Sequence, residues 1–188
     1  MPAADSSVHL PTKRQAKIYP TALGHGFSNA TLGPQDPSYR GDYAINGGTK
    51  FQTWESEDVS QETDGIVTAR CLTAQKDITD GVSNTILIAE KYLNPDRYMD
   101  GCNDSDNEPA VSGDSRDQVR WGTVLPHQDI PGMDSWGYGF GSAHFSSYGS
   151  AFADGSVRHI RYGIPYQLYL NLLNKADGQV VNMVGFVD

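Results

Sequence analysis

The chain has 188 residues and a mass of 20.5 kDa, enough for one domain with its own hydrophobic core. Lys and Arg total 14 against 23 Asp and Glu, which gives a net charge of −9. The phosphate backbone of a nucleic acid would repel a protein of this charge, so composition argues against nucleic-acid binding. No apolar run approaches the roughly 18 residues of a membrane-spanning helix, and an apolar content of 38% is too high for a disordered chain. Composition therefore predicts a soluble, acidic, globular protein.

The first part of the chain differs in character from the rest. Residues 1–40 are rich in turn formers and predict an extended, loop-rich N-terminal segment, whereas residues 41–188 predict one β-rich domain. Within that domain, residues 65–74 (GIVTARCLTA) are a candidate strand. Residues 85–89 (TILIA) predict a buried strand, because the run is continuous, β-branched and too short for a helix. Residues 118–125 (QVRWGTVL) predict a further strand.

Residues 150–162 (SAFADGSVRHIRY) predict a β-hairpin. Asp154-Gly155 fits a two-residue loop, whose central residues need positive φ. With such a loop the opposed pairs would be Phe152 with Val157 on one face and Ala153 with Ser156 on the other.

One helix is predicted after the hairpin. Pro165 suits its first position and Gly178 is placed to cap its end. Apolar residues recur every fourth position, with two more widening the stripe, so the helix is expected to pack on a sheet. The stripe consists of Ile164, Leu168, Tyr169, Leu172, Leu173 and Ala176. The predicted fold class is α+β: mainly a twisted antiparallel β-sheet with long loops and one C-terminal helix.

Residues 94–118 form a long acidic stretch, with seven Asp or Glu against two Arg. Asp104, Asp106 and Glu108 alternate, so their oxygens could face one point, as Ca²⁺ requires. The spacing is not that of an EF-hand. The alternative to an irregular Ca²⁺ site is a solvated acidic loop.

The histidines occur singly, without the spacings that mark strong zinc or copper sites; they are His9, His25, His127, His144 and His159. Distant ligands could still converge, and His127 or His159 could join His144 at a copper or zinc centre. Asp154 is a further candidate ligand, although a turn residue is its simplest role. The alternatives are scattered surface histidines, and a His144 that bonds a carbonyl or carboxylate to fix its loop.

The cysteines and tryptophans each allow two interpretations. Cys71 and Cys102 could form one disulfide or remain unrelated thiols. Trp54, Trp121 and Trp136 could form a carbohydrate-stacking platform, or they could be packing residues.

No catalytic constellation emerges from the sequence. GYGFG (137–141) is not the dinucleotide fingerprint, and SGDS (112–115) lacks the nucleophile elbow of a hydrolase. No enzymatic activity is predicted.

Several motifs resemble those of one family, and they occur in the family's order. They are DYAINGG (42–48), DGVSNTILIAEKYLNPD (80–96), the acidic stretch ending DNE (106–108), FGSAHFSSYGSAFADGSVRHI (140–160) and NKADGQVV (174–181). In the fourth, nine residues separate His144 from Asp154-Gly155. The combination is similar to the planctomycete prepilin-like proteins with a C-terminal His-x9-Asp-Gly motif, a pseudopilin-type family of unknown function also labelled secretion-pathway protein G-like.

The resemblance implies a pseudopilin-like sheet and a periplasmic, cell-surface or extracellular location, but no reaction. Members of that family begin with a hydrophobic prepilin helix, which this sequence does not show, so a soluble part of such a protein is expected. Leu10 in LPTKR (10–14) stands where the family usually has a Cys, which implies one fewer cross-link or ligand.

The leading hypothesis is an exported, non-enzymatic, pilin-like or pseudopilin-like structural or secretion-associated module, with a cation such as Ca²⁺ ordering its loops. Its partners would be proteins or further copies, assembled through the missing helix, with no nucleic acid and no other membrane contact. The alternatives are a copper or zinc protein that uses His144 and, more weakly, a carbohydrate-binding module.

Overall fold

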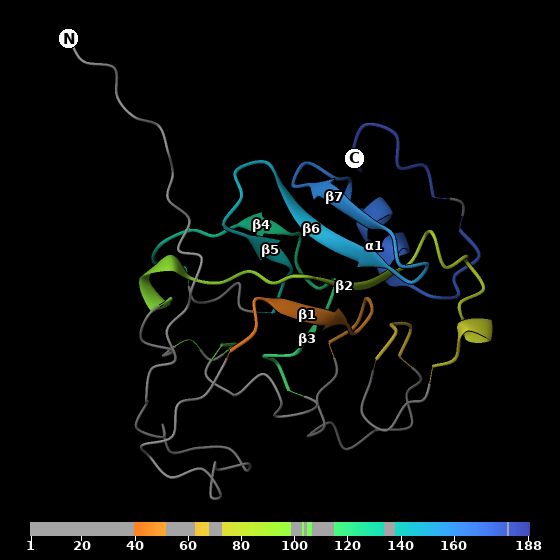
Figure 1. Cartoon of the computed structure of the whole chain (residues 1–188), viewed down its shortest axis with the longest axis horizontal. Coiled ribbons are helices and arrows are strands. Elements are labelled where there is room, and N and C mark those ends of the chain that lie inside the picture. The colour runs from red at the N-terminus through yellow and green to blue at the C-terminus, as the bar shows by residue number, and fades with distance from the viewer. Residues whose placement is uncertain are drawn as a thin grey trace, which may run out of the picture.

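A five-stranded mixed sheet with one short helix on one face dominates the computed structural model (Figure 1). The structure describes residues 40–51, 63–67, 73–98, 103, 105–106, 115–133, 138–179 and 181–188. The main sheet has the order β3-β1-β2-β6-β7, and β4 and β5 form a separate two-stranded sheet. The elements are β1 (Tyr43–Asn46), η1 (Gln75–Asp77), β2 (Ile86–Glu90), η2 (Pro95–Arg97), β3 (Val119–Arg120), β4 (His127–Gln128), β5 (Gly141–Ser142), β6 (Ser147–Phe152), β7 (Val157–Arg161) and α1 (Tyr166–Leu173).

The α+β prediction is confirmed, with one refinement in strand direction. The pairs β1–β2, β2–β6 and β6–β7 are antiparallel, but β3 runs parallel to β1. The predicted buried strand at 85–89 is confirmed as β2, which lies at the centre of the sheet. Its pairing with β6 shifts by one residue between Ile86 and Ile88, so a β-bulge leaves Leu87 38% exposed.

The hairpin is confirmed, but its predicted register is wrong by one residue. Ala151, not Phe152, pairs with Val157. The N–H of Gly155 donates to the carbonyl of Phe152, and the N–H of Phe152 donates to the carbonyl of Ser156, so the loop has three residues. Gly155 has φ +84°, the conformation that closes such a loop with a bulge. Because side chains alternate along a strand, Phe152 and Val157 lie on opposite faces.

Two other predicted strands are shorter than expected or lie elsewhere. Of 118–125, only Val119–Arg120 forms a strand. Of 65–74, residues 65–67 and 73–74 are not strand, and residues 68–72 lie outside the described part of the chain. The N–H groups of Ile66 and Val67 donate to the carbonyl of Asn46, so this segment crosses the end of β1.

Helix α1 begins one residue later than predicted and also ends earlier than predicted. Pro165 is its N-cap, one position before the first helical residue. The helix stops at Asn174, which has φ −81° and ψ 136°, so Ala176 and Gly178 lie beyond it. The chain leaves the helix there because Lys175 is held by its own N–H and side chain, which donate to three carbonyls, those of Asp64, Thr63 and Gly65.

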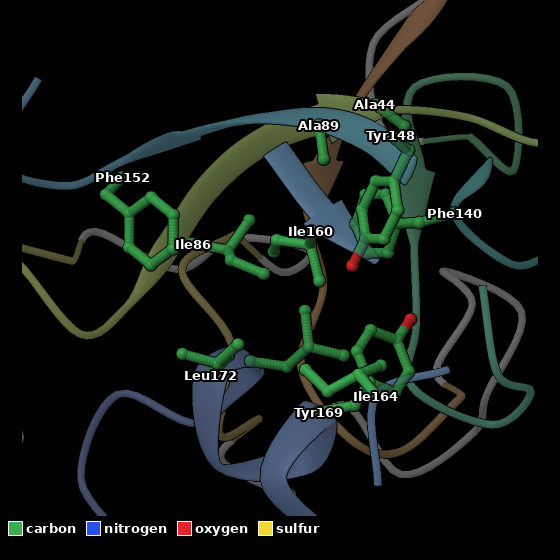
Figure 2. Close-up of a cluster of buried hydrophobic side chains, with 11 residues drawn as sticks. Ala44, Ile86, Ala89, Phe140, Tyr148, Phe152, Ile160, Ile164, Tyr169 and Leu172 are labelled. Carbon is green, nitrogen blue, oxygen red and sulfur yellow. The ribbon is translucent and has the colours of Figure 1, made fainter. Parts of the chain in front are cut away.

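The core lies between α1 and one face of the sheet. Figure 2 shows Leu172, Ile164 and Tyr169 directed from the helix side toward Ile86 and Ile160 of the sheet. Phe152 and Tyr148 of β6 belong to the same fully buried cluster, so this face of the sheet is closed. No helix in the described ranges is long and apolar enough to cross a membrane.

Candidate functional site on the open face of the sheet

The other face of the sheet carries an apolar row across four strands. Register places Ile45 of β1 beside Ile88 of β2, Ile88 beside Ala151 of β6, and Ala151 beside Val157 of β7. These four residues are here called the apolar row. Ile45, Ile88 and Ala151 are half-buried, and Val157 is 73% exposed. A sheet face in contact with water normally carries polar side chains.

A second row, with polar groups, runs beside the first. Tyr43 pairs with Glu90, and Gly149 pairs with His159. Glu90 links the two pairs, because its Oε2 accepts a hydrogen bond of 2.6 Å from the N–H of Gly149. Tyr43 is 57% exposed, so its ring extends the apolar surface.

His144 joins this second row from the loop before β6. Its Nε2 lies 3.5 Å from Oε1 of Glu90, with the His144 side chain 46% exposed and that of Glu90 17% exposed. The carboxylate of Glu90 is therefore the nearest counterpart to the carbonyl or carboxylate that the sequence analysis expected beside His144. Glu90 thus holds one carboxylate oxygen on the backbone of β6 and turns the other to the imidazole.

The hydroxyls of buried Ser142 and half-buried Tyr162 position the loop that carries His144. Ser142 Oγ lies 2.9 Å from the hydroxyl of Tyr162 and accepts from the N–H of His144 at 3.1 Å. The Tyr162 hydroxyl also lies 3.1 Å from the carbonyl of His144, to which it can donate. Burial raises the pKa of Tyr162 to about 12, so this phenol stays protonated at neutral pH.

The other predicted histidine ligands do not join His144 in one group. Within the described ranges, no three His, Cys, Asp or Glu side chains come together as a metal site. His127 begins β4, with its ring 6.5 Å from that of Tyr92, and burial lowers its pKa. His159 is exposed in the second row of the open face. His9 and His25 lie outside the described residues.

Asp154 lies far from His144, at the other end of β6. His144 precedes this six-residue strand and Asp154 follows it, so they are separated by about 20 Å at 3.3 Å per residue. Asp154 Oδ1 accepts from the N–H and the hydroxyl of Ser156, at 2.8 and 2.6 Å. The first of these bonds is that of an Asx-type turn, and both lower the pKa of Asp154.

Asp106 faces cations rather than open solvent. Its carboxylate lies 2.8 Å from Arg40 and 3.0 Å from Lys91, and the three side chains are almost completely buried. Asp104 and Glu108, the other two members of the predicted Ca²⁺ site, lie outside the described residues. Two neighbouring cations already compensate Asp106, which weakens its attraction for a Ca²⁺ ion.

Trp121 is a packing residue. It is 3% exposed and meets Phe51 edge to face, with ring centroids 4.7 Å apart. Arg116 lies over the neighbouring ring of Tyr138. A carbohydrate platform built on Trp121 is therefore not available at the surface. Trp54, Trp136, Cys71 and Cys102 lie outside the described residues.

Sequence reasoning missed Glu90, Tyr162 and the charges that surround Asp106. Glu90 follows directly on the apolar run of β2, and its alternation with Ile88 is the one signal that it shares the open face. Nothing local connects Tyr162 with Ser142, or Lys91 with Asp106. These contacts depend on how β2, β3 and β6 are ordered in the sheet.

Comparison with known proteins gives one family. A family model described as protein of unknown function (DUF1559) matches residues 9–167, which is most of the chain. No curated protein and no solved structure gives a significant match.

Proposed function

The chain belongs to this family of proteins of unknown function (DUF1559), and on that premise we propose that it is an exported, non-enzymatic, pilin-like or pseudopilin-like assembly module. The partner is a second copy of the chain or a subunit of the same kind, which binds the open face of the sheet. The observation that carries the proposal is the apolar row from Ile45 to Val157, continued by exposed Leu87 and Tyr43. Contiguous exposed apolar surface of this kind marks an interaction site.

The charges around the row support a partner of the same kind. The chain carries −9 overall. Among the described residues of the open face, the acidic group is Glu90, which is bound by the N–H of Gly149 and faces His144. Arg161 at the end of β7 is paired with Asp188 at 3.1 Å. The described part of this face is therefore close to neutral on an acidic molecule, which favours contact between two copies through this face.

Analytical ultracentrifugation of the full chain tests this proposal. We expect concentration-dependent association, abolished by Val157→Asp because the new carboxylate would be desolvated at the contact. Val184→Asp is the matched control, since Val184 is 83% exposed and lies outside the sheet. A chain that stays monomeric at millimolar concentration, or equal effects of the two variants, would contradict the proposal.

Transition-metal binding at His144 and Glu90 is the second candidate function. Two ligands of a tetrahedral zinc ion with bonds of about 2.05 Å lie about 3.4 Å apart, close to the 3.5 Å between His144 Nε2 and Glu90 Oε1. Zinc and copper titrations by calorimetry, with EPR for copper, should show one site that is lost in His144→Ala and kept in His159→Ala. Elemental analysis, with melts in EDTA, covers the Ca²⁺ hypothesis as well; a melt unchanged by EDTA and no metal in the protein would remove both.

A further inference from the structure

Three hydroxyl groups in the described part of the core are buried without a hydrogen-bond partner. They belong to Tyr148 and Ser150 of β6 and to Tyr169 of α1. Tyr148 and Tyr169 are 0% exposed, and Ser150 is 2% exposed. A hydroxyl that leaves water without gaining a partner destabilises the fold, so such groups are rare in native proteins.

The three hydroxyls reach the core from its two sides. Tyr148 and Ser150 are two positions apart on β6, so their side chains share the face of the sheet that α1 covers. Figure 2 shows Tyr148 directed from the sheet toward the helix, and Tyr169 directed from the helix toward the sheet. The hydroxyls of the two tyrosines therefore face each other across the core, yet no hydrogen bond joins them.

The pKa values of the two tyrosines reflect how close the three side chains lie. Burial raises the pKa of Tyr169 well above its ordinary value of 10, and neighbouring Tyr148 raises it further. Burial is also the main cause of the raised pKa of Tyr148, an effect that the hydroxyl of Ser150 opposes. Tyr148 is thus a neighbour of both other residues. Both phenols stay protonated at neutral pH, so each brings an O–H donor to the cluster.

The chemistry of the cluster decides what can join its members. Each hydroxyl both donates and accepts hydrogen bonds, so a bridging molecule has to do the same. Members of the same core cluster, among them Phe140, Ile160 and Ile164, are apolar, and apolar surroundings disfavour an ion. A buried water molecule typically makes about three hydrogen bonds to buried polar groups, which matches the three hydroxyls here.

We propose that one internal water molecule binds between α1 and β6, hydrogen-bonded to the hydroxyls of Tyr148, Ser150 and Tyr169. Its oxygen accepts from the two phenols, and one of its O–H groups donates to Oγ of Ser150. The water gives all three buried hydroxyls a partner and connects the helix to the central part of the sheet. It thereby fixes α1 against the strand whose other face presents Ala151 in the apolar row.

Magnetic relaxation dispersion of ¹⁷O-water, which counts long-lived internal water molecules in solution, tests this site in the full chain. The amplitude should fall by one water molecule in the double variant Tyr148→Phe/Tyr169→Phe, which lacks two of the three partners. Tyr166→Phe is the matched control on the same helix and should leave the amplitude unchanged, because Tyr166 is 45% exposed and its hydroxyl donates to the carbonyl of Gly122 at 2.9 Å. Equal amplitudes in the native chain and the double variant would overturn the proposal.

Two further measurements identify the position and the bonding of the water. A high-resolution crystal structure should show it within hydrogen-bond distance of the hydroxyls of Tyr148 and Tyr169, whereas direct bonds among the three hydroxyls would refute the bridge. Tyr169→Phe should raise the equilibrium constant of unfolding by about 2- to 10-fold, because it removes one hydrogen bond. A constant that stays the same or falls would contradict the proposal, since deleting an unsatisfied hydroxyl only removes a penalty.

Discussion

Asn46 is expected to be the side chain whose loss most directly loosens the sheet from the helix. It is fully buried at the end of β1, and its Nδ2 donates to the carbonyls of Ile86 and Leu173, both at 2.8 Å. Its Oδ1 accepts from the N–H of Gly48, also at 2.8 Å. Three buried hydrogen bonds at about 1 kcal/mol each predict that Asn46→Ala lowers the free energy of unfolding by about 3 kcal/mol. For a chain of this size that corresponds to a fall in Tm of about 6–12 °C.

Urea unfolding followed by circular dichroism measures this cost, with an unchanged m-value as the sign that two-state unfolding is kept. Asn182→Ala is the control, because Asn182 is exposed and accepts one hydrogen bond, from Val184. Asn46→Asp should be worse than Asn46→Ala, since it turns a buried carboxylate toward two carbonyls. A cost below about 1 kcal/mol for Asn46→Ala would show that water or other donors satisfy these carbonyls, and the reasoning would fail.

Three other substitutions test separate parts of the fold. Asp106→Ala should lower the free energy of unfolding in urea by about 3–5 kcal/mol, because it removes the carboxylate that lies 3.0 Å from the buried ammonium of Lys91. A decrease of less than about 1 kcal/mol would contradict this. The pKa of Asp154 is lower in the folded chain than the ordinary value of 3.8. The ionised Asp154 carboxylate therefore stabilises the fold above pH 3.8, and this stabilisation is lost as the pH falls through the lower pKa of the folded state. The difference in urea midpoint between the native chain and Asp154→Ala should therefore shrink with acidification, and a difference that is constant with pH would refute the assignment. Gly65→Ala should lower the free energy of unfolding by about 3 kcal/mol or more, because the new Cβ would lie 2.2 Å from backbone atoms of Gly47 and Gly48. Gly163→Ala is the control: its Cβ would meet nothing within 4 Å, so the free energy of unfolding should change by no more than about 0.5 kcal/mol. Equal losses of stability in the two variants would be inconsistent with this packing.

The sequence predicted correctly those elements that depend on interactions between residues close together along the chain. The apolar run at 85–89 became a central strand, the Asp-Gly turn a hairpin, and the stripe after Pro165 a helix on a sheet. The end of that helix was not predictable, because it depends on Lys175 donating to residues 63–65, a segment far away in sequence. A glycine at 178 looked like a cap only because the sequence does not show this competing contact.

The candidate site was predictable only in part, for a related reason. His144 was singled out from its motif, but its neighbour was expected among other histidines or Asp154 rather than at Glu90. Glu90 and His144 meet because β2 and β6 are neighbours, and strand order is a property of the whole sheet. The acidic stretch shows the same limit: its charge predicted a solvated or Ca²⁺-binding loop, whereas Asp106 is buried against Arg40 and Lys91.

The composition of the open face follows from the hairpin turn. With the two-residue loop that the sequence suggested, Phe152 would share a face with Val157, and the register between β6 and β7 would shift by one residue. The observed loop has three residues because Gly155 adopts φ +84° and the N–H of Phe152 bonds to Ser156. Phe152 is therefore directed into the core at 0% exposure, while Val157 completes the apolar row at 73% exposure. If the open face is the assembly surface, the Asp-Gly pair of the His-x9-Asp-Gly motif has an architectural role: it sets which side chains β7 presents to a partner.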